Sequence, residues 1–144
     1  MNSYENGKPG RTIIVRLDPG DDLLASVYAV IRAHGIGDGY IASGIGTLSH
    51  CMLHMVMTTG YPAVEHFAEW HDAPLELASV SGIIADGTPH LHAVVSNDKR
   101  SLAGHVEPGC IILYLGELVI QEVLGQPMKR LKNARNVAEL MEKP

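Results

Sequence analysis

Short apolar segments separated by turn residues recur along the chain, and one main stretch has helical spacing. Residues 12–17 are rich in β-branched side chains and predict a first strand. After an Asp-Pro-Gly turn, residues 23–34 predict a helix that Asp21 or Asp22 can cap and Gly35 can end. The helix prediction depends on apolar residues that recur on one face: Leu23, Val27, Val30 and Ile31.

The remaining apolar segments predict strands. A turn signal at 86–89 separates two of them and suggests a hairpin. The last strand is long and apolar, and we expect it to be buried on both faces. The pattern therefore predicts an α+β fold, with a mostly antiparallel sheet packed against one main helix. The expected strands cover residues 40–45, 48–58, 63–70, 75–85, 90–96 and 111–124.

The length of 144 residues suits one domain. Residues 1–10 are polar and predict a flexible N-terminal tail. The periodic segments fall within residues 11–126, which we expect to form the folded domain. Residues 127–144 predict a polar C-terminal tail with a weak helical pattern near 137–141.

Composition narrows the class of protein. Hydrophobic residues make up 46% of the chain and charged residues 19%, which excludes a disordered protein. No apolar run reaches the roughly 20 residues that a membrane helix needs, and no signal peptide is visible, so we expect a cytoplasmic protein without a membrane partner. In such a reducing compartment, Cys51 and Cys110 are expected to be buried thiols.

Three histidines form the most informative pattern. His90 and His92 are two residues apart on a predicted strand, so their side chains share one face. His105 follows after a glycine-containing loop and can fold back beside them. Three imidazoles can bind zinc at about 2.0–2.1 Å and leave a fourth position open for water or a small anion. An His-x-His pair also arises by chance on a polar strand face, so spacing alone leaves both interpretations open.

The other five histidines are expected to have structural or solvent roles. On one strand, His50 and His54 would lie roughly 13 Å apart, too far to bind one ion together. His66 and His71 would face opposite sides of a continuous strand. His34 ends the predicted helix, where a positive charge is mildly favoured.

Seven blocks of residues stand in a distinctive order over residues 11–124: Arg16-Leu17, Gly20-Asp21-Asp22-Leu23, Gly35-Ile36-Gly37-Asp38-Gly39-Tyr40-Ile41, Gly44-Ile45-Gly46-Thr47-Leu48, Leu75-Glu76-Leu77-Ala78-Ser79-Val80-Ser81-Gly82, Pro89-His90-Leu91-His92 and Ala103-Gly104-His105-Val106. In order and spacing, these blocks resemble the plants-and-prokaryotes conserved (PPC) domain family. Ala103 stands where the last block of the family usually has its first glycine, which leaves the loop geometry open but not the histidine.

The resemblance implies an α+β fold that assembles as a homotrimer, so the first expected partner is the chain itself. It also implies a divalent metal, with zinc the first choice, held by His90, His92 and His105. The family carries a DNA-binding label because its plant members couple the domain to an AT-hook. Here no Arg-Gly-Arg-Pro core is present, and residues 8–11 hold similar letters in the wrong order.

Three functions compete on these grounds. The first is a metal-binding trimeric PPC protein, with DNA binding or regulation implied only by the family. The second is a metal-dependent enzyme acting on a small molecule, since a three-histidine zinc can polarise a carbonyl or activate water. Glu76 is its candidate base, although it could instead satisfy buried backbone groups or pair with a cation. The third is a module whose function is subunit interaction.

The net charge of the chain gives little support to nucleic-acid binding. The net charge is −5 with neutral histidines, whereas DNA-binding domains usually present a basic face. A terminal basic cluster could still contact phosphate, although such a run is usually only solvated. Its members are Lys129, Arg130, Lys132 and Arg135.

Overall fold

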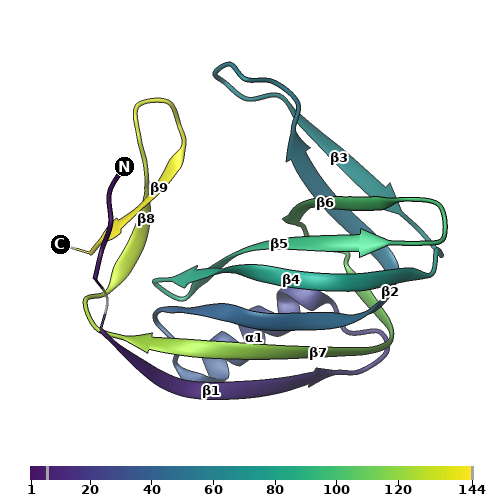
Figure 1. Cartoon of the computed structure of the whole chain (residues 1–144), viewed down its shortest axis with the longest axis horizontal. Helices are drawn as coiled ribbons and strands as arrows, with labels where there is room; N and C mark the ends of the chain where they lie inside the picture. Colours follow the sequence, from purple (N-terminus) through teal and green to yellow (C-terminus); the bar gives the residue numbers. More distant parts are fainter. Residues whose placement is uncertain (6, 144) are drawn as a thin grey trace.

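A mostly antiparallel sheet with one helix on its face forms the body of the structure (Figure 1). It is a computed structural model that describes residues 1–5 and 7–143. The predicted combination of sheet and single main helix is confirmed. The elements are β1 (Lys8–Leu17), α1 (Leu23–His34), β2 (Gly39–Val56), β3 (Glu65–Trp70), β4 (Leu75–Ala85), β5 (Thr88–Ser96), β6 (Ser101–Val106), β7 (Ile111–Leu124), β8 (Met128–Lys132) and β9 (Ala138–Glu142).

The helix forms at the predicted residues for local reasons. Asp22 is its N-cap, and the Asp22 carboxylate accepts a hydrogen bond from the Ala25 N–H at 2.8 Å. Gly35 ends it in the left-handed conformation, with φ at 62°. Leu23, Val27 and Ile31 face the sheet and are buried. Among residues 1–5 and 7–143, no helix is long and apolar enough to cross a membrane.

One long strand closes part of the sheet on itself. The strand order is β1-β7-β2-β4-β5-β6, with β3 paired to β2 and a further pairing between β2 and β6. Residues 39–50 of β2 pair with β7 and β4, and residues 51–56 pair with β3 and β6. Strands β2, β4, β5 and β6 therefore form a closed ring. The two strands predicted at 40–45 and 48–58 are one strand of 18 residues, because shifts of register let it bend without breaking.

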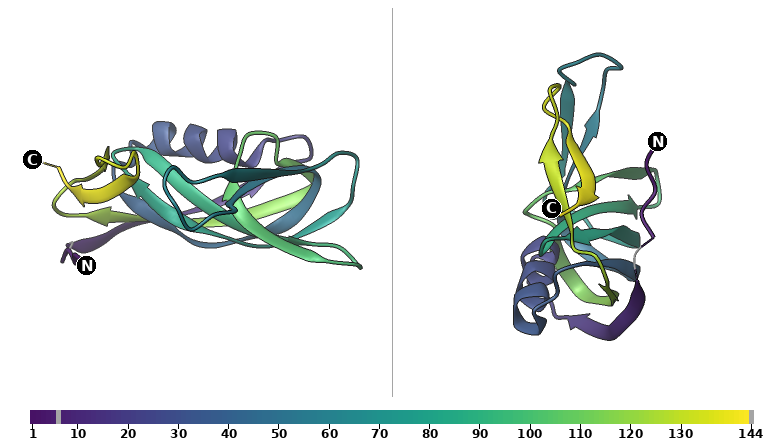
Figure 2. Two further views of the ribbon diagram at one scale, coloured as in Figure 1. Left: turned by 90° about the horizontal axis from the view of Figure 1, so that it is seen from above. Right: turned by 90° about the vertical axis from the view of Figure 1, so that its left-hand side faces the viewer.

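One face of the sheet is covered by the helix and the other is exposed. Helix α1 lies over one face, as Figure 2 shows from above, and the buried core lies between them. On β7, Leu118 and Ile120 point into this core and are almost fully buried. The opposite face is open, and Ile14 on β1 is 82% exposed there. The prediction that β7 is buried on both faces is therefore wrong within one chain, because no described element covers the second face at this strand.

The two cysteines lie in the core as predicted. Cys51 and Cys110 are buried and free, and their sulfur atoms are 3.9 Å apart. The hydrogen bond with the Cys110 thiol, followed by burial, raises the pKa of Cys51, which favours its neutral form. Cys51 is on β2 and Cys110 directly precedes β7, and both belong to the buried core as small apolar side chains.

Both predicted tails need correction. Strand β1 begins at Lys8, so the last residues of the predicted N-terminal tail are part of the sheet. The helical pattern predicted near 137–141 is a strand instead, because β9 pairs with β8 across a hairpin. The Asn133 carboxamide accepts hydrogen bonds from the backbone of its turn and fixes that hairpin. Asn6 and Pro144 fall within the predicted tails and lie outside the described residues.

An ion pair joins the first and seventh strands to the helix end. The Arg11 guanidinium donates to the Glu122 carboxylate at 2.7 and 2.8 Å, and it also donates to the His34 carbonyl at 2.8 Å. Glu122 lies at a buried position of β7. The side-chain hydrogen bond from Arg11 lowers the pKa of Glu122 to about 2.

This depressed pKa predicts a loss of stability in acid. A carboxylate with a lowered folded-state pKa stabilises the fold fully above its ordinary pKa, and the stabilisation disappears as pH falls towards 2. The unfolding midpoint of Glu122→Gln should therefore lie below that of the natural chain at pH 6, with the difference vanishing near pH 2. Thermal unfolding followed by circular dichroism measures this. The exposed Glu117 of the same strand provides the control, as Glu117→Gln. A difference that stays constant from pH 6 to pH 2 would contradict the prediction.

Candidate metal centre

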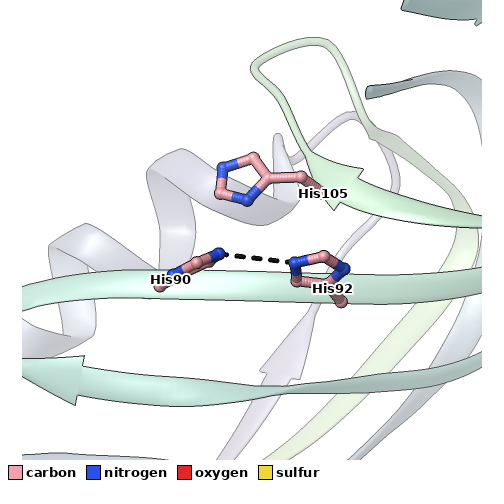
Figure 3. A group of neighbouring side chains, drawn as sticks. All are labelled: His90, His92 and His105. Atoms are coloured by element: carbon pink, nitrogen blue, oxygen red, sulfur yellow. Dashed lines mark hydrogen bonds between the residues drawn. The ribbon is translucent and has the colours of Figure 1, made fainter. Parts of the chain in front are cut away.

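Two neighbouring strands bring the three predicted histidines together. On β5, the buried Leu91 separates His90 from His92, so both imidazoles project from the open face of the sheet. Strand β6 runs antiparallel to β5 and places His105 directly opposite His92. Figure 3 shows the three rings converging above β5, as the sequence predicted.

The distances in this group fit a tetrahedral zinc site. Ligand nitrogens of His90, His92 and His105 all lie within 4.8 Å of one another. The Nε2 atoms of His90 and His92 are 3.3 Å apart, at hydrogen-bond distance (Figure 3). Two nitrogens bound tetrahedrally to zinc at 2.0–2.1 Å are separated by roughly the same 3.3 Å. The pair on β5 is therefore already spaced as two zinc ligands would be.

The surroundings keep two of the rings neutral. Burial, reinforced by the nearby imidazoles of His90 and His54, lowers the pKa of His105 to about 4. Partial burial first, and the positive charge of Arg130 second, lower the pKa of His90. Neutral imidazole is the form that binds a metal ion, since protonation occupies the lone pair of the ring nitrogen. Both residues are therefore in the ligand form at neutral pH.

Two further residues extend the cluster. His54 on β2 lies opposite His105 on β6, and their ring centroids are 4.6 Å apart. The Nδ1 atom of His54 is 2.6 Å from a carboxylate oxygen of Glu107. His54, His105 and Glu107 form a second group with ligand atoms within 4.8 Å of one another. His105 thus belongs to two overlapping sets of ligands.

Sequence reasoning missed these two residues for different reasons. His54 was predicted to have a structural role because it could not reach His50, but its actual neighbour comes from β6 through the closure of the ring. Glu107 was not considered, although it stands only two residues after His105. The alternation of strand side chains from His105 to Glu107 was the signal that could have found it.

Glu76, the predicted base, lies away from the histidines. It is on β4, which pairs with β5 as predicted, but the register places Glu76 opposite Ser96. Ser96 is four residues along β5 from His92, or roughly 13 Å at the rise of a strand. Glu76 is exposed there, so it neither reaches the candidate metal centre nor satisfies buried backbone groups.

The basic residues predicted as phosphate contacts do not form one patch. Arg130 turns onto the sheet and donates to the carbonyls of Thr88 and Ile83 at 3.0 and 2.9 Å. The Arg135 guanidinium lies over the ring of Tyr61, 4.9 Å from its centroid. Lys129 and Lys132 remain on β8, whose partner strand β9 carries Glu139 and Glu142. The positive charges of the four basic residues are therefore dispersed. Arg130 lies beside the candidate metal centre, Arg135 lies on an aromatic ring, and the two lysines lie beside an acidic strand.

The fold and the histidine blocks agree with a match to a known family. A model of the Plants and Prokaryotes Conserved (PCC) domain matches residues 4–124. The chain belongs to this family. All three histidines on β5 and β6 lie within the matched PCC region, whereas the β8–β9 hairpin lies beyond its end.

Solved structures share the fold over almost the full chain. A metal-containing protein from Archaeoglobus fulgidus is 22% identical with a TM-score of 0.81, covering 99% of this chain and 100% of that one. A plant- and prokaryote-conserved protein from Pyrococcus horikoshii is 24% identical with a TM-score of 0.81, covering 100% and 99%. A protein from Bacteroides thetaiotaomicron, whose name proposes DNA binding, is 22% identical with a TM-score of 0.80, covering 98% and 99%.

Curated relatives are much longer than this chain. The bifunctional protein GlmU of Synechococcus sp. (strain JA-3-3Ab) is 30% identical over 122 residues, which cover 83% of this chain and 18% of that protein. For the GlmU of a second Synechococcus strain, JA-2-3B'a(2-13), the coverage is 75% and 16%. The chain thus spans less than a fifth of the curated relatives that it matches.

Proposed function

We propose that this protein binds a divalent cation, with zinc the best fit, through His90, His92 and His105. The observation that carries the proposal is the 3.3 Å separation of the two β5 nitrogens, with His105 on β6 directly opposite His92. Imidazole is a common ligand for zinc and related transition metals. The name of the Archaeoglobus fulgidus protein, which shares the fold, also states that it contains metal. Three protein ligands leave room for a water molecule or a small anion.

Metal analysis of the purified chain tests this function. After treatment with a chelator and dialysis against zinc, the chain should retain about one zinc ion per polypeptide, as one three-histidine site requires. Retention should fall when the dialysis is repeated in acid, because protons compete for the ring nitrogens. Elemental analysis gives the stoichiometry. Absence of retained zinc at neutral pH would overturn the proposal.

We also propose that the protein is a homotrimer, as the resemblance to the PPC family implies. Support comes from the open face of the sheet, where Ile14 pairs across the strands with Val119, and Ile45 lies on the same face beside Glu117. Ile14 and Ile45 are 82% and 49% exposed. Apolar side chains gathered on a sheet face favour association with another copy. This region covers β1, β7 and β2, whereas the histidines are on β5 and β6.

The molar mass of the protein in solution tests the trimer directly. Light scattering should give about three times the chain mass of 15.5 kDa. Ile14→Asp should reduce this to the mass of a single chain, because an aspartate in a packed interface would be desolvated without a partner. Ala29→Asp on the exposed side of α1 is the matched control and should leave the trimer intact. A natural chain that is monomeric at micromolar concentration would exclude the assembly.

The two other functions have less support in this chain. DNA binding is suggested by the name of the Bacteroides protein, but the net charge here is −5 and the basic residues of the C-terminal segment are dispersed. A metal-dependent enzyme would need a free acid or base beside the metal. Glu76 is too far away along the sheet, and the Glu107 carboxylate in the cluster is engaged with Nδ1 of His54. Metal binding within a trimer is therefore the function that the geometry favours.

A further inference from the structure

A hollow beside the histidines is built partly by the C-terminal hairpin. Its volume is about 310 Å³, at the lower end of the range for small-molecule sites. The hairpin lies beyond the residues that match the PCC domain, so this wall is an addition to the matched region. The side chains that line the hollow include His90, His92, Ile83, Arg130, Ala138 and Leu140.

The charge in this hollow is positive and unbalanced. No carboxylate lines it, and within residues 1–5 and 7–143 no acidic side chain forms an ion pair with Arg130. Partial burial removes water from the guanidinium and lowers the pKa of Arg130. An anion that enters the hollow would therefore meet a partly desolvated positive charge, where ion pairing is stronger than at an open surface.

Two hydrogen bonds hold this guanidinium in place. Arg130 donates from Nη1 to the Thr88 carbonyl and from Nη2 to the Ile83 carbonyl. A guanidinium has five N–H donors, so three remain for a ligand. The carbonyls fix its orientation without cancelling its charge, and a fixed planar fork is suited to carboxylate and phosphate groups.

We propose that this hollow binds the carboxylate or phosphate group of a small molecule, with Arg130 as the residue that binds the anion. Ile83 and Leu140 provide an apolar wall for the remainder of that molecule. The metal proposed at His90 and His92 lies on the same hollow and binds a second donor atom of the ligand. This last element rests on the proposed function, whereas anion binding by Arg130 does not.

Anion titrations with two probes test the proposal. Inorganic phosphate and butyrate are titrated separately into the metal-free and the zinc-loaded natural chain, followed by amide chemical shifts of Gly82 and Ala138. We expect saturable binding of at least one probe, tighter in the zinc-loaded protein. A preference for phosphate or for butyrate identifies which anionic group the ligand carries. Absence of saturable binding of either probe in both forms would overturn the proposal.

Variants separate anion binding from hairpin packing. Arg130→Gln should weaken binding at least tenfold in both forms of the protein, whereas Arg130→Lys should retain part of it because the charge remains. Lys132→Gln removes the same charge from the same strand and should bind as the natural chain does. Unchanged binding in Arg130→Gln, or an equal loss in Lys132→Gln, would show that Arg130 only anchors the hairpin or that the attraction is non-specific.

One more variant distinguishes failure of the anion-site proposal from failure of the metal-site proposal. His105→Ala should remove only the increase in affinity that zinc produces and should leave binding to the metal-free protein, because His105 belongs to the metal cluster but does not line the hollow. If zinc does not bind the natural chain but Arg130-dependent binding persists, the metal proposal fails and the anion site stands. If zinc binds and Arg130→Gln has no effect, the reverse holds.

Discussion

Replacing His92 with alanine should lower the affinity of the chain for zinc on the order of a hundredfold or more. Even changes in residues that only orient metal ligands cost 10–100-fold in affinity, so loss of a ligand should cost at least the upper end of this range. His105→Ala should have a larger effect, because His105 belongs to both sets of ligands in the cluster. Competition with a chromophoric zinc chelator measures the affinities.

The other histidines give this experiment its controls. His66 on β3 is exposed and remote in sequence from β5 and β6, so His66→Ala should bind zinc as the natural chain does. Full zinc affinity in both His92→Ala and His105→Ala would place any ion elsewhere. If His92→Ala binds normally but His54→Ala does not, the ion lies instead among His54, His105 and Glu107.

The second large effect is expected at Gly82, on β4 beneath the β5 histidines. A Cβ atom there would lie 2.1 Å from the His90 carbonyl oxygen and 2.9 Å from the Leu91 Cα, and the residue has φ at 156°. Gly82→Ala must therefore push β5 away from β4. We expect destabilisation of about 3 kcal/mol, the upper part of the usual range for overpacking. Urea unfolding measures it.

The same substitution should also weaken zinc binding, because the backbone of His90 has to move. Gly37→Ala is the matched control, since a Cβ there has no neighbour within 4 Å and should change stability little. Stability of Gly82→Ala equal to that of Gly37→Ala would show that the two strands can separate without cost. Loss of stability with unchanged zinc affinity would show that the metal centre tolerates a shift of β5.

Predictions from the sequence succeeded where the signal was local. The cap at Asp22, the stop at Gly35 and the apolar face between them determine α1 within one segment. The shared face of His90 and His92 follows from the alternation of a single strand. These features need no knowledge of distant partners, so the pattern of residues was sufficient to predict them.

Other features depend on contacts that no local pattern contains. His54 meets His105 because β2 is long enough to pair with β6 after it has paired with β4. Arg130 reaches the histidines because residues 127–143 fold as a hairpin, although their polarity is typical of a solvated tail. A closed ring of strands and a returning terminal segment are decided by the whole sheet, so the composition of each segment could not reveal them.

The pairing of β1 with β7 has a consequence for synthesis of the protein. Lys8 lies opposite Leu124, so the first strand finds its only described partner near the end of the matched region. At about 5–20 residues per second, the ribosome needs on the order of ten seconds between completing β1 and completing β7. During that interval β1 has no edge to join, and the apolar side of α1 lacks much of the sheet that will cover it. Strand β1 therefore remains accessible to chaperones and proteases until β7 has emerged, whereas β2, β4, β5 and β6 can pair with one another earlier.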